Sequence, residues 1–226
     1  ADLEAIRTEA RRRLEECIDP AYGETIRGLV PSGSRIMGVR VPVIRDLAKA
    51  LLAEYRELNA PAVCDLMDAC CRERCREELL LVLVMLARFR RRLTPEVWPR
   101  IDRWIEAIDN WEVCDHLARN IAAELVARDP RFERDLLAWT GSRNHWRRRF
   151  ALAVTTALNQ GGRRNVELAL RICEPLMRDS HDMVQKAVGW ALRDAAKHDR
   201  AGVGRFLDRW ASRADPKILR EAGRRK

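Results

Sequence analysis

The stretches Asn-Trp-Glu-Val-Cys-Asp (110–115) and Asn-His-Trp-Arg-Arg-Arg (144–149) share the pattern that decides the fold. Each begins with an asparagine, a residue that favours the capping position just before a helix, and their tryptophans lie 35 residues apart. The same interval separates Trp104 from Trp139 just upstream. A repeat of about 20 to 50 residues, in which each unit is too small to bury its own apolar face, is typical of a solenoid. The spacing therefore predicts helix pairs stacked along the chain.

Helical periodicity and start signals extend this pattern to the whole sequence. Two later segments, opening at Asp182 and at Asp215, begin with comparable capping residues at similar distances, which brings the stacked pairs to four. The sequence predicts helices over residues 2–17, 20–28, 41–57, 61–71, 73–91, 96–107, 111–127, 131–140, 145–158, 164–176, 183–197, 201–211 and 216–224.

Composition favours a single all-α domain that spans residues 1–226. The apolar fraction of 47% is enough for a continuous core, and two tyrosines and few glycines argue against many strands. The longest apolar run, residues 79–87, is far shorter than the roughly 20 residues of a membrane span, so it predicts a buried core helix. Residues 3–17 have the spacing of an amphipathic helix rather than a secretion signal. We expect a cytoplasmic protein with no membrane partner.

The cysteines favour reduced thiols. There are seven, an odd number, and they lie inside the helical patterns. Cys64, Cys70, Cys71 and Cys75 cluster, and the last two are four residues apart on one helix face. No Cys-x-x-Cys pair and no nearby histidine completes a tetrahedral zinc site. We therefore expect buried apolar thiols and no metal.

Positive charge is concentrated in the later repeats. Residues 141–226 hold 20 Lys and Arg against 9 Asp and Glu, a net +11, whereas the first 140 residues carry −2. A one-sided field of this kind is typical of a protein that binds a polyanion, most often nucleic acid. The alternative is a solvated, arginine-rich surface without a partner.

Three helices carry unusual chemistry. Trp111 and Asp115 are four residues apart, so an aromatic plane and a carboxylate share one helix face. Three arginines, at 147–149, begin a helix, where positive charge opposes the helix dipole unless an anion such as a phosphate compensates. A later helix carries Gly189 in its interior, next to the cationic and aromatic face formed by Lys186, Trp190 and Arg193. Gly189 predicts a close approach between helices.

Each feature also has a purely structural interpretation. Tryptophans at repeat-equivalent positions pack between helix pairs in most solenoids, an interpretation that we apply to Trp98, Trp104, Trp139, Trp146 and Trp210. Asp115 has a second possible role, because Arg119 follows it at the i+4 position of an ordinary helix salt bridge.

At these residues the chain resembles the AlkD-like DNA alkylation repair glycosylases, which are HEAT-like repeat proteins. The resemblance covers most of the chain. It rests on five blocks in matching order: Gly38, Val39, Pro42 and Arg45; Trp111 and Asp115; Asn144, Trp146 and Arg149; Gln185 to Trp190 with Leu192, Arg193 and Asp194; and Arg220 to Ala222. Two positions depart from the commoner pattern, with glutamate at 112 and aspartate at 194.

The resemblance implies an α-solenoid whose concave basic surface binds double-stranded DNA, and removal of N3- and N7-alkylated purines without metal or organic cofactor. Asp115 is then the catalytic carboxylate, Trp111 and Trp190 flank the lesion nucleotide, and Arg149 holds a phosphate. Arg147, Arg148, Lys186 and Arg193 complete the expected DNA-binding set of a monomeric enzyme. Two alternatives remain: a non-enzymatic HEAT-repeat binder of damaged or branched DNA, and a protein-interaction scaffold, which the charge distribution disfavours.

Overall fold

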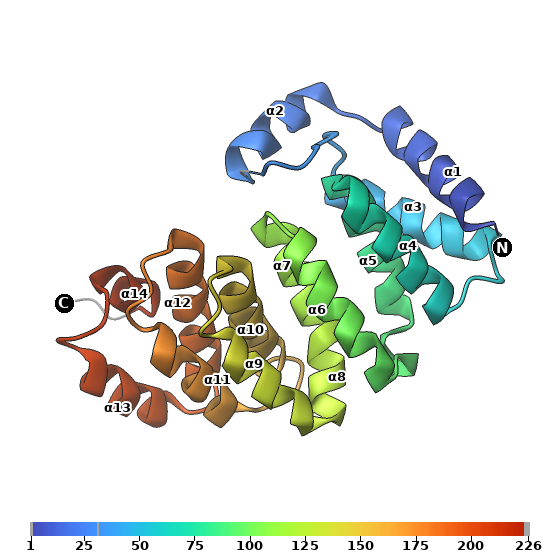
Figure 1. Cartoon of the computed structure of the whole chain (residues 1–226). Helices are drawn as coiled ribbons and strands as arrows, with labels where there is room; N and C mark the ends of the chain where they lie inside the picture. The colour runs from blue at the N-terminus through green and yellow to red at the C-terminus, as the bar shows by residue number, and fades with distance from the viewer. Residues whose placement is uncertain (1, 31, 224–226) are drawn as a thin grey trace. The chain divides into compact units, whose positions relative to one another are not determined.

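The computed structural model describes residues 2–30 and 32–223, and they form helices, turns and loops (Figure 1). Within these ranges there is no β-strand, and the one isolated bridge pairs Arg35 with Cys75. The prediction of an all-α fold is confirmed. The chain divides into two compact units, residues 1–117 and residues 118–226. A single domain over residues 1–226 and a solenoid with a concave basic surface stay predictions.

Unit 1 (residues 1–117) is built around one apolar helix, α5, which packs against four others: α1, α3, α4 and α7. Its residues 79–83 are all buried, so the prediction of a core helix in this run is confirmed. In chain order the helices are α1 Leu3–Glu16, α2 Pro20–Leu29, α3 Val41–Glu54, α4 Ala60–Glu73, α5 Arg76–Arg88, the 3-10 turns Arg90–Arg92 and Pro95–Val97, α6 Trp98–Ala107 and α7 Trp111–Leu117.

Unit 2 (residues 118–226) repeats a helix pair. The second helix of each pair packs against that of the next pair, α10 against α12 and α12 against α14. The first helices of two successive pairs, α9 and α11, also contact each other. In chain order the elements are a π-helical segment Ala118–Ala122, α8 Ala123–Arg128, the 3-10 turn Pro130–Phe132, α9 Glu133–Trp139, α10 His145–Ala157, α11 Val166–Cys173, the 3-10 turn Glu174–Leu176, α12 Asp182–Ala196, α13 Arg200–Trp210 and α14 Pro216–Glu221.

Within the described residues the predicted helices recur with end shifts of a few residues, and residue 224, the predicted end of the last helix, lies outside those residues. The asparagine caps of the repeat are confirmed: the Asn110 side chain accepts from the backbone N–H of Val113 at 3.0 Å, and that of Asn144 accepts from Trp146 at 2.9 Å. One difference lies in residues 111–127, because the predicted uninterrupted helix contains five π-helical residues. Such segments are not encoded by apolar periodicity, and they occur often at functional sites.

The assignment of tryptophans to the core is confirmed for three residues and wrong in part for two. Trp98, Trp104 and Trp146 are buried. Trp139 and Trp210 are half-exposed: the first contacts Phe150 edge to face, and the second lies under the guanidinium of Arg213. Each is the last residue of its helix, α9 or α13, so no further helical turn of its own element covers the ring.

The clustered cysteines are free thiols, three of them buried and Cys71 half-buried. Burial raises the pKa of Cys64 to about 11, that of Cys71 to about 12 and that of Cys75 to about 11. The expectation that Cys71 and Cys75 share a helix face is wrong, because α4 ends at Glu73 and Arg74 adopts a left-handed φ of 54°. Among the described residues, no three His, Cys, Asp or Glu side chains are grouped as metal ligands. None of the described helices has the length and apolar character needed to cross a membrane.

Candidate functional site

Helix α7 places Trp111 and Asp115 one turn apart, as the spacing predicts. Both side chains are half-buried, so the aromatic ring and the carboxylate are partly accessible to a ligand. The cap at Asn110 defines where α7 begins, and the first helical residue is Trp111 itself. This geometry suits a site in which a carboxylate and an indole face act on the same group.

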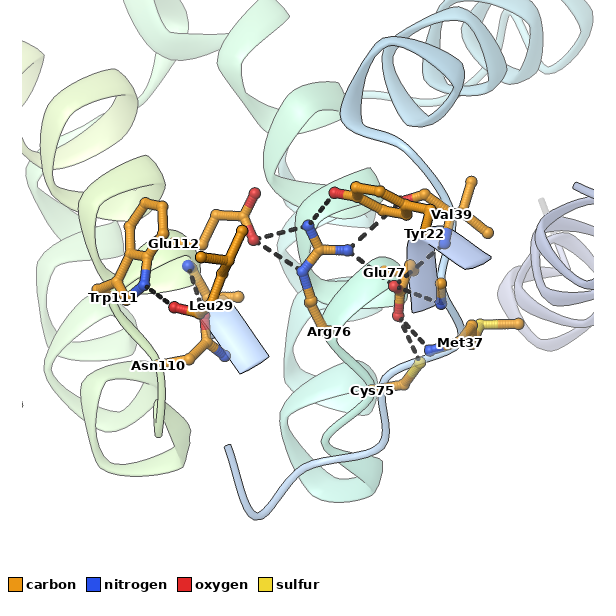
Figure 2. A network of polar contacts seen from close by, with 12 residues as sticks. Tyr22, Leu29, Met37, Val39, Cys75, Arg76, Glu77, Asn110, Trp111 and Glu112 are labelled. Atoms are coloured by element: carbon orange, nitrogen blue, oxygen red, sulfur yellow. Dashed lines mark hydrogen bonds and ion pairs between the residues drawn. The ribbon is translucent and has the colours of Figure 1, made fainter. Parts of the chain in front are cut away.

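The Trp111 ring is held by a hydrogen bond from outside its own helix. Its indole Nε1–H donates to the backbone carbonyl of Leu29, the last residue of α2, at 3.2 Å (Figure 2). A tryptophan χ2 angle is otherwise broadly distributed, so this bond restricts the orientation of the ring. No sequence signal connects the two residues, which are far apart in the chain.

A buried ion network lies next to the Trp111 turn. The guanidinium of Arg76 is fully buried and pairs with Glu77 and Glu112, each at 2.7 Å, and Nη2 donates to the Tyr22 hydroxyl at 3.3 Å (Figure 2). Burial lowers the pKa of Arg76, but the charges of Glu112 and Glu77 outweigh this and raise the pKa overall. Glu112, the residue that departs from the family pattern, therefore serves to anchor α7.

Glu77 connects this network to the Gly38-Val39 block. The carboxylate of Glu77 accepts from the backbone N–H groups of Met37 at 2.9 Å and Gly38 at 3.0 Å. Gly38 has a φ of +98°, and a β-carbon there would lie 2.8 Å from the Cα of Gly23, so only glycine fits. This motif is structural in unit 1. No spacing in the sequence points to Arg76 and Glu77, because charged residues at the start of an apolar helix are usually solvated.

The three arginines at the start of α10 all have protein contacts. Arg147 lies over the Trp139 ring at 5.5 Å, and Arg148 donates to the Asp179 carboxylate at 2.6 Å and to the Ser142 carbonyl at 2.7 Å. Arg149 is 6% exposed and donates to the Met183 carbonyl at 2.7 Å. The Asp179 carboxylate thus supplies part of the negative charge that offsets these arginines at the helix start, a role for which the sequence suggested an anion such as a phosphate.

Two histidine rings stack at the N-terminal ends of α10 and α12. No pattern in the sequence signals this contact. The rings of His145 and His181 are 3.7 Å apart and nearly parallel. Burial lowers the pKa of both side chains, and the neighbouring cation Arg148 lowers it further. His181 also caps α12, because its Nδ1 accepts from the Met183 N–H at 3.3 Å.

Helix α12 carries the remaining candidates. Lys186 pairs with Asp182 at 3.0 Å, Arg193 donates to the Glu221 carbonyl, and both side chains are about half exposed, at 49% and 46%. Of the five cations expected to bind DNA, these two are therefore the most accessible to a polyanion within unit 2. Trp190 is half-buried.

Trp190 has a cationic neighbour that the sequence did not predict. The Arg119 guanidinium, from the π-helical segment, lies 5.1 Å from the Trp190 ring centre, and its Nη2 donates to the side-chain amide oxygen Oε1 of Gln160 at 2.6 Å. The Gln160 amide donates in turn to the buried carboxylate of Asp194 at 2.7 Å. Asp194, at the end of the Gln185–Asp194 block, therefore supports Trp190 from within unit 2.

Gly189 marks a close contact between two of the sequence blocks. A β-carbon at this position would lie 2.6 Å from the backbone carbonyl carbon of Glu221 and would also meet the Glu221 β-carbon. The predicted close approach is confirmed, and it joins the Gln185–Asp194 block on α12 to the Arg220–Ala222 block on α14.

Gly189→Ala is expected to lower the free energy of unfolding by about 1–3 kcal/mol, because α14 must move to admit the methyl group. Gly204→Ala on α13 is the matched control: a β-carbon at Gly204 would meet nothing within 4 Å, so the better helix propensity of alanine should stabilise by up to about 1 kcal/mol. Urea unfolding of both variants measures the difference. Equal effects of the same sign would contradict the close contact.

Comparisons with known proteins agree on the fold and point to one family. The model of the DNA alkylation repair enzyme family matches residues 10–225. Among solved structures, the chain is similar to a predicted DNA alkylation repair enzyme from Enterococcus faecalis, with 20% sequence identity and a TM-score of 0.78. That similarity covers 91% of this chain and 95% of the other, and at this identity it supports the fold alone. No curated protein matches the chain.

Proposed function

Because the chain belongs to the DNA alkylation repair enzyme family, we propose that it excises cationic N3- and N7-alkylated purines from duplex DNA by hydrolysing the glycosidic bond. Its role in alkylation repair follows from the family, and the reaction is the proposal. The observation that carries the reaction is the pairing of Trp111 and Asp115, both half-exposed, one turn apart on α7.

The chemistry needs little from the protein beyond electrostatics. A purine alkylated at N3 or N7 carries a positive charge, so the electron pair of the breaking C1′–N bond neutralises the departing base. Positive charge then develops on the deoxyribose, and a nearby carboxylate stabilises it. In the proposed mechanism Asp115 supplies that carboxylate and orients the water. The water oxygen bonds to C1′ and its proton passes to bulk water, and neither a metal nor a cofactor is required.

The aromatic and cationic residues would bind the substrate. An indole face attracts a cation by about 0.5–2 kcal/mol, which suits Trp111 and Trp190 to contact the lesion nucleotide. Phosphate contacts from Lys and Arg position a duplex without reading its sequence. In unit 2, Lys186 and Arg193 are accessible enough for this role, and Arg149 donates to the Met183 carbonyl. We propose that Arg147 and Arg148 act on DNA mainly through their positive charge, which attracts the phosphates.

We also propose that the protein acts as a monomer in the cytoplasm.

The test is release of free base from methylated duplex DNA in the presence of a strong chelator. N7-methylguanine and N3-methyladenine should appear, while duplexes that contain uracil or hypoxanthine should stay intact. Neutral bases are poor leaving groups that need a general acid, which typically contributes about 10²–10⁴-fold. Chromatography of the released bases measures both reactions. Uracil release at a comparable rate would refute the mechanism, and DNA binding without any release would favour the non-enzymatic binder.

A further inference from the structure

The loop after α2 is hydrogen-bonded to Asp109, which lies two residues before the start of α7. The hydroxyls of Ser32 and Ser34 each donate to the carboxylate of Asp109 at 2.7 Å, one to each oxygen, and the Asn110 amide donates to it at 3.2 Å. We call Ser32, Ser34 and Asp109 the serine clasp. All three of its side chains are partly buried, so the contact is not a chance surface pair.

The clasp carboxylate stays ionised. Burial pushes the pKa of Asp109 upward, but the hydrogen bonds from Ser32 and Ser34 outweigh burial and leave the pKa below its ordinary value. Hydrogen bonds to a charged acceptor are about twice as strong as those between neutral groups. The clasp is therefore a firm link between the loop and α7 at neutral pH.

The same two segments meet a second time at the Trp111 ring. Asp109 lies two residues before Trp111, and Leu29, whose carbonyl accepts the indole N–H, lies three residues before Ser32. The Leu29 side chain is 64% exposed and adds little packing. Its carbonyl shares a peptide group with the N–H of Val30, which donates to the Ile26 carbonyl at 2.8 Å, and the Val30 side chain is fully buried. The carbonyl is therefore fixed at the end of α2, and the clasp acts on the other partner, because it binds Asp109, two residues before Trp111, to the loop after α2.

We propose that Asp109 is a positioning residue, which, through Ser32 and Ser34, holds the start of α7 beside the end of α2, keeps the indole N–H on the Leu29 carbonyl and so sets the plane of the Trp111 ring. This inference rests on the proposed function only for its catalytic consequence. A misplacement of about 1 Å in a positioning contact can cost as much as about 10²-fold in rate. The clasp would then act on base release without touching DNA.

The experiment removes the two donors and leaves α7 unaltered. The double variant Ser32→Ala/Ser34→Ala of the full chain is compared with wild type and with Ser212→Ala, an exposed serine of unit 2. The indole N–H resonance of Trp111, assigned by its loss in Trp111→Phe, reports the hydrogen bond in ¹⁵N-labelled protein. Its exchange with solvent should become at least about tenfold faster in the double variant and stay unchanged in Ser212→Ala.

Activity supplies the second measurement. Single-turnover release of N7-methylguanine should fall at least about fivefold in the double variant, with duplex affinity within about twofold of wild type. A lower melting temperature with an unchanged Trp111 resonance would show that the serines only stabilise the loop, which overturns the proposal. Faster exchange with undiminished release would overturn it too. If wild type released no base, the proposed function would fail, whereas the exchange rate would still decide whether the clasp holds the ring.

Discussion

Asp115→Asn is expected to slow single-turnover release of N7-methylguanine at least about tenfold while duplex affinity stays nearly unchanged. The substitution keeps the size of the side chain and removes its charge. A carboxylate that stabilises the positive sugar acts mainly in the transition state, so its loss lowers the rate and not the binding. Quenched time courses at saturating enzyme, together with titrations on the same duplex, measure the two quantities.

Asp46→Asn is the matched control for Asp115. It makes the same change on an exposed residue of α3, far in the sequence from α7, and should alter neither rate nor affinity. Wild-type rates in Asp115→Asn would remove this carboxylate from the mechanism. An equal loss of rate and affinity would instead indicate that Asp115 contributes to DNA binding.

Arg76→Met is expected to give the largest loss of stability of any substitution considered, about 3–5 kcal/mol. Arg76 and Glu77 are both fully buried, and the variant leaves the Glu77 carboxylate without its counter-charge. Three backbone N–H donors, from Met37, Gly38 and Val39, remain, but they do not neutralise a buried charge. The midpoint of urea unfolding should fall accordingly.

Arg72→Met provides the comparison, because Arg72 is exposed near the end of α4. We expect a change within about 0.5 kcal/mol there. A loss below about 1 kcal/mol in Arg76→Met would mean that Glu77 takes up a proton or reaches water in the variant, and that the ion network is not what anchors the Gly38-Val39 loop.

Some of the candidate site follows from sequence alone. Trp111 and Asp115 share a turn of α7, and Asn110 and Asn144 cap their helices, as predicted. Gly189 meets α14 as its position inside a helix suggests, although only the structure identifies Glu221 as the neighbour.

Other assignments needed contacts that no spacing rule predicts. Arg119 lies at the i+4 position from Asp115, yet its side chain donates to Gln160 and covers the ring of Trp190. Arg148 has the sequence context of a phosphate ligand and forms an ion pair with Asp179. In both cases a partner tens of residues away determines what the guanidinium does.

The all-α class, the start of the repeated helices and the face shared by Trp111 and Asp115 can be predicted from the sequence, because capping and helical periodicity act within about four residues. Three features become visible only in the folded chain: Arg76 and Glu77 are buried, Asp109 holds the loop after α2, and Leu29 accepts from Trp111. The difference is one of range, because burial and hydrogen bonding at these residues depend on segments that lie 36 to 82 positions away in the chain and meet only when the helices pack.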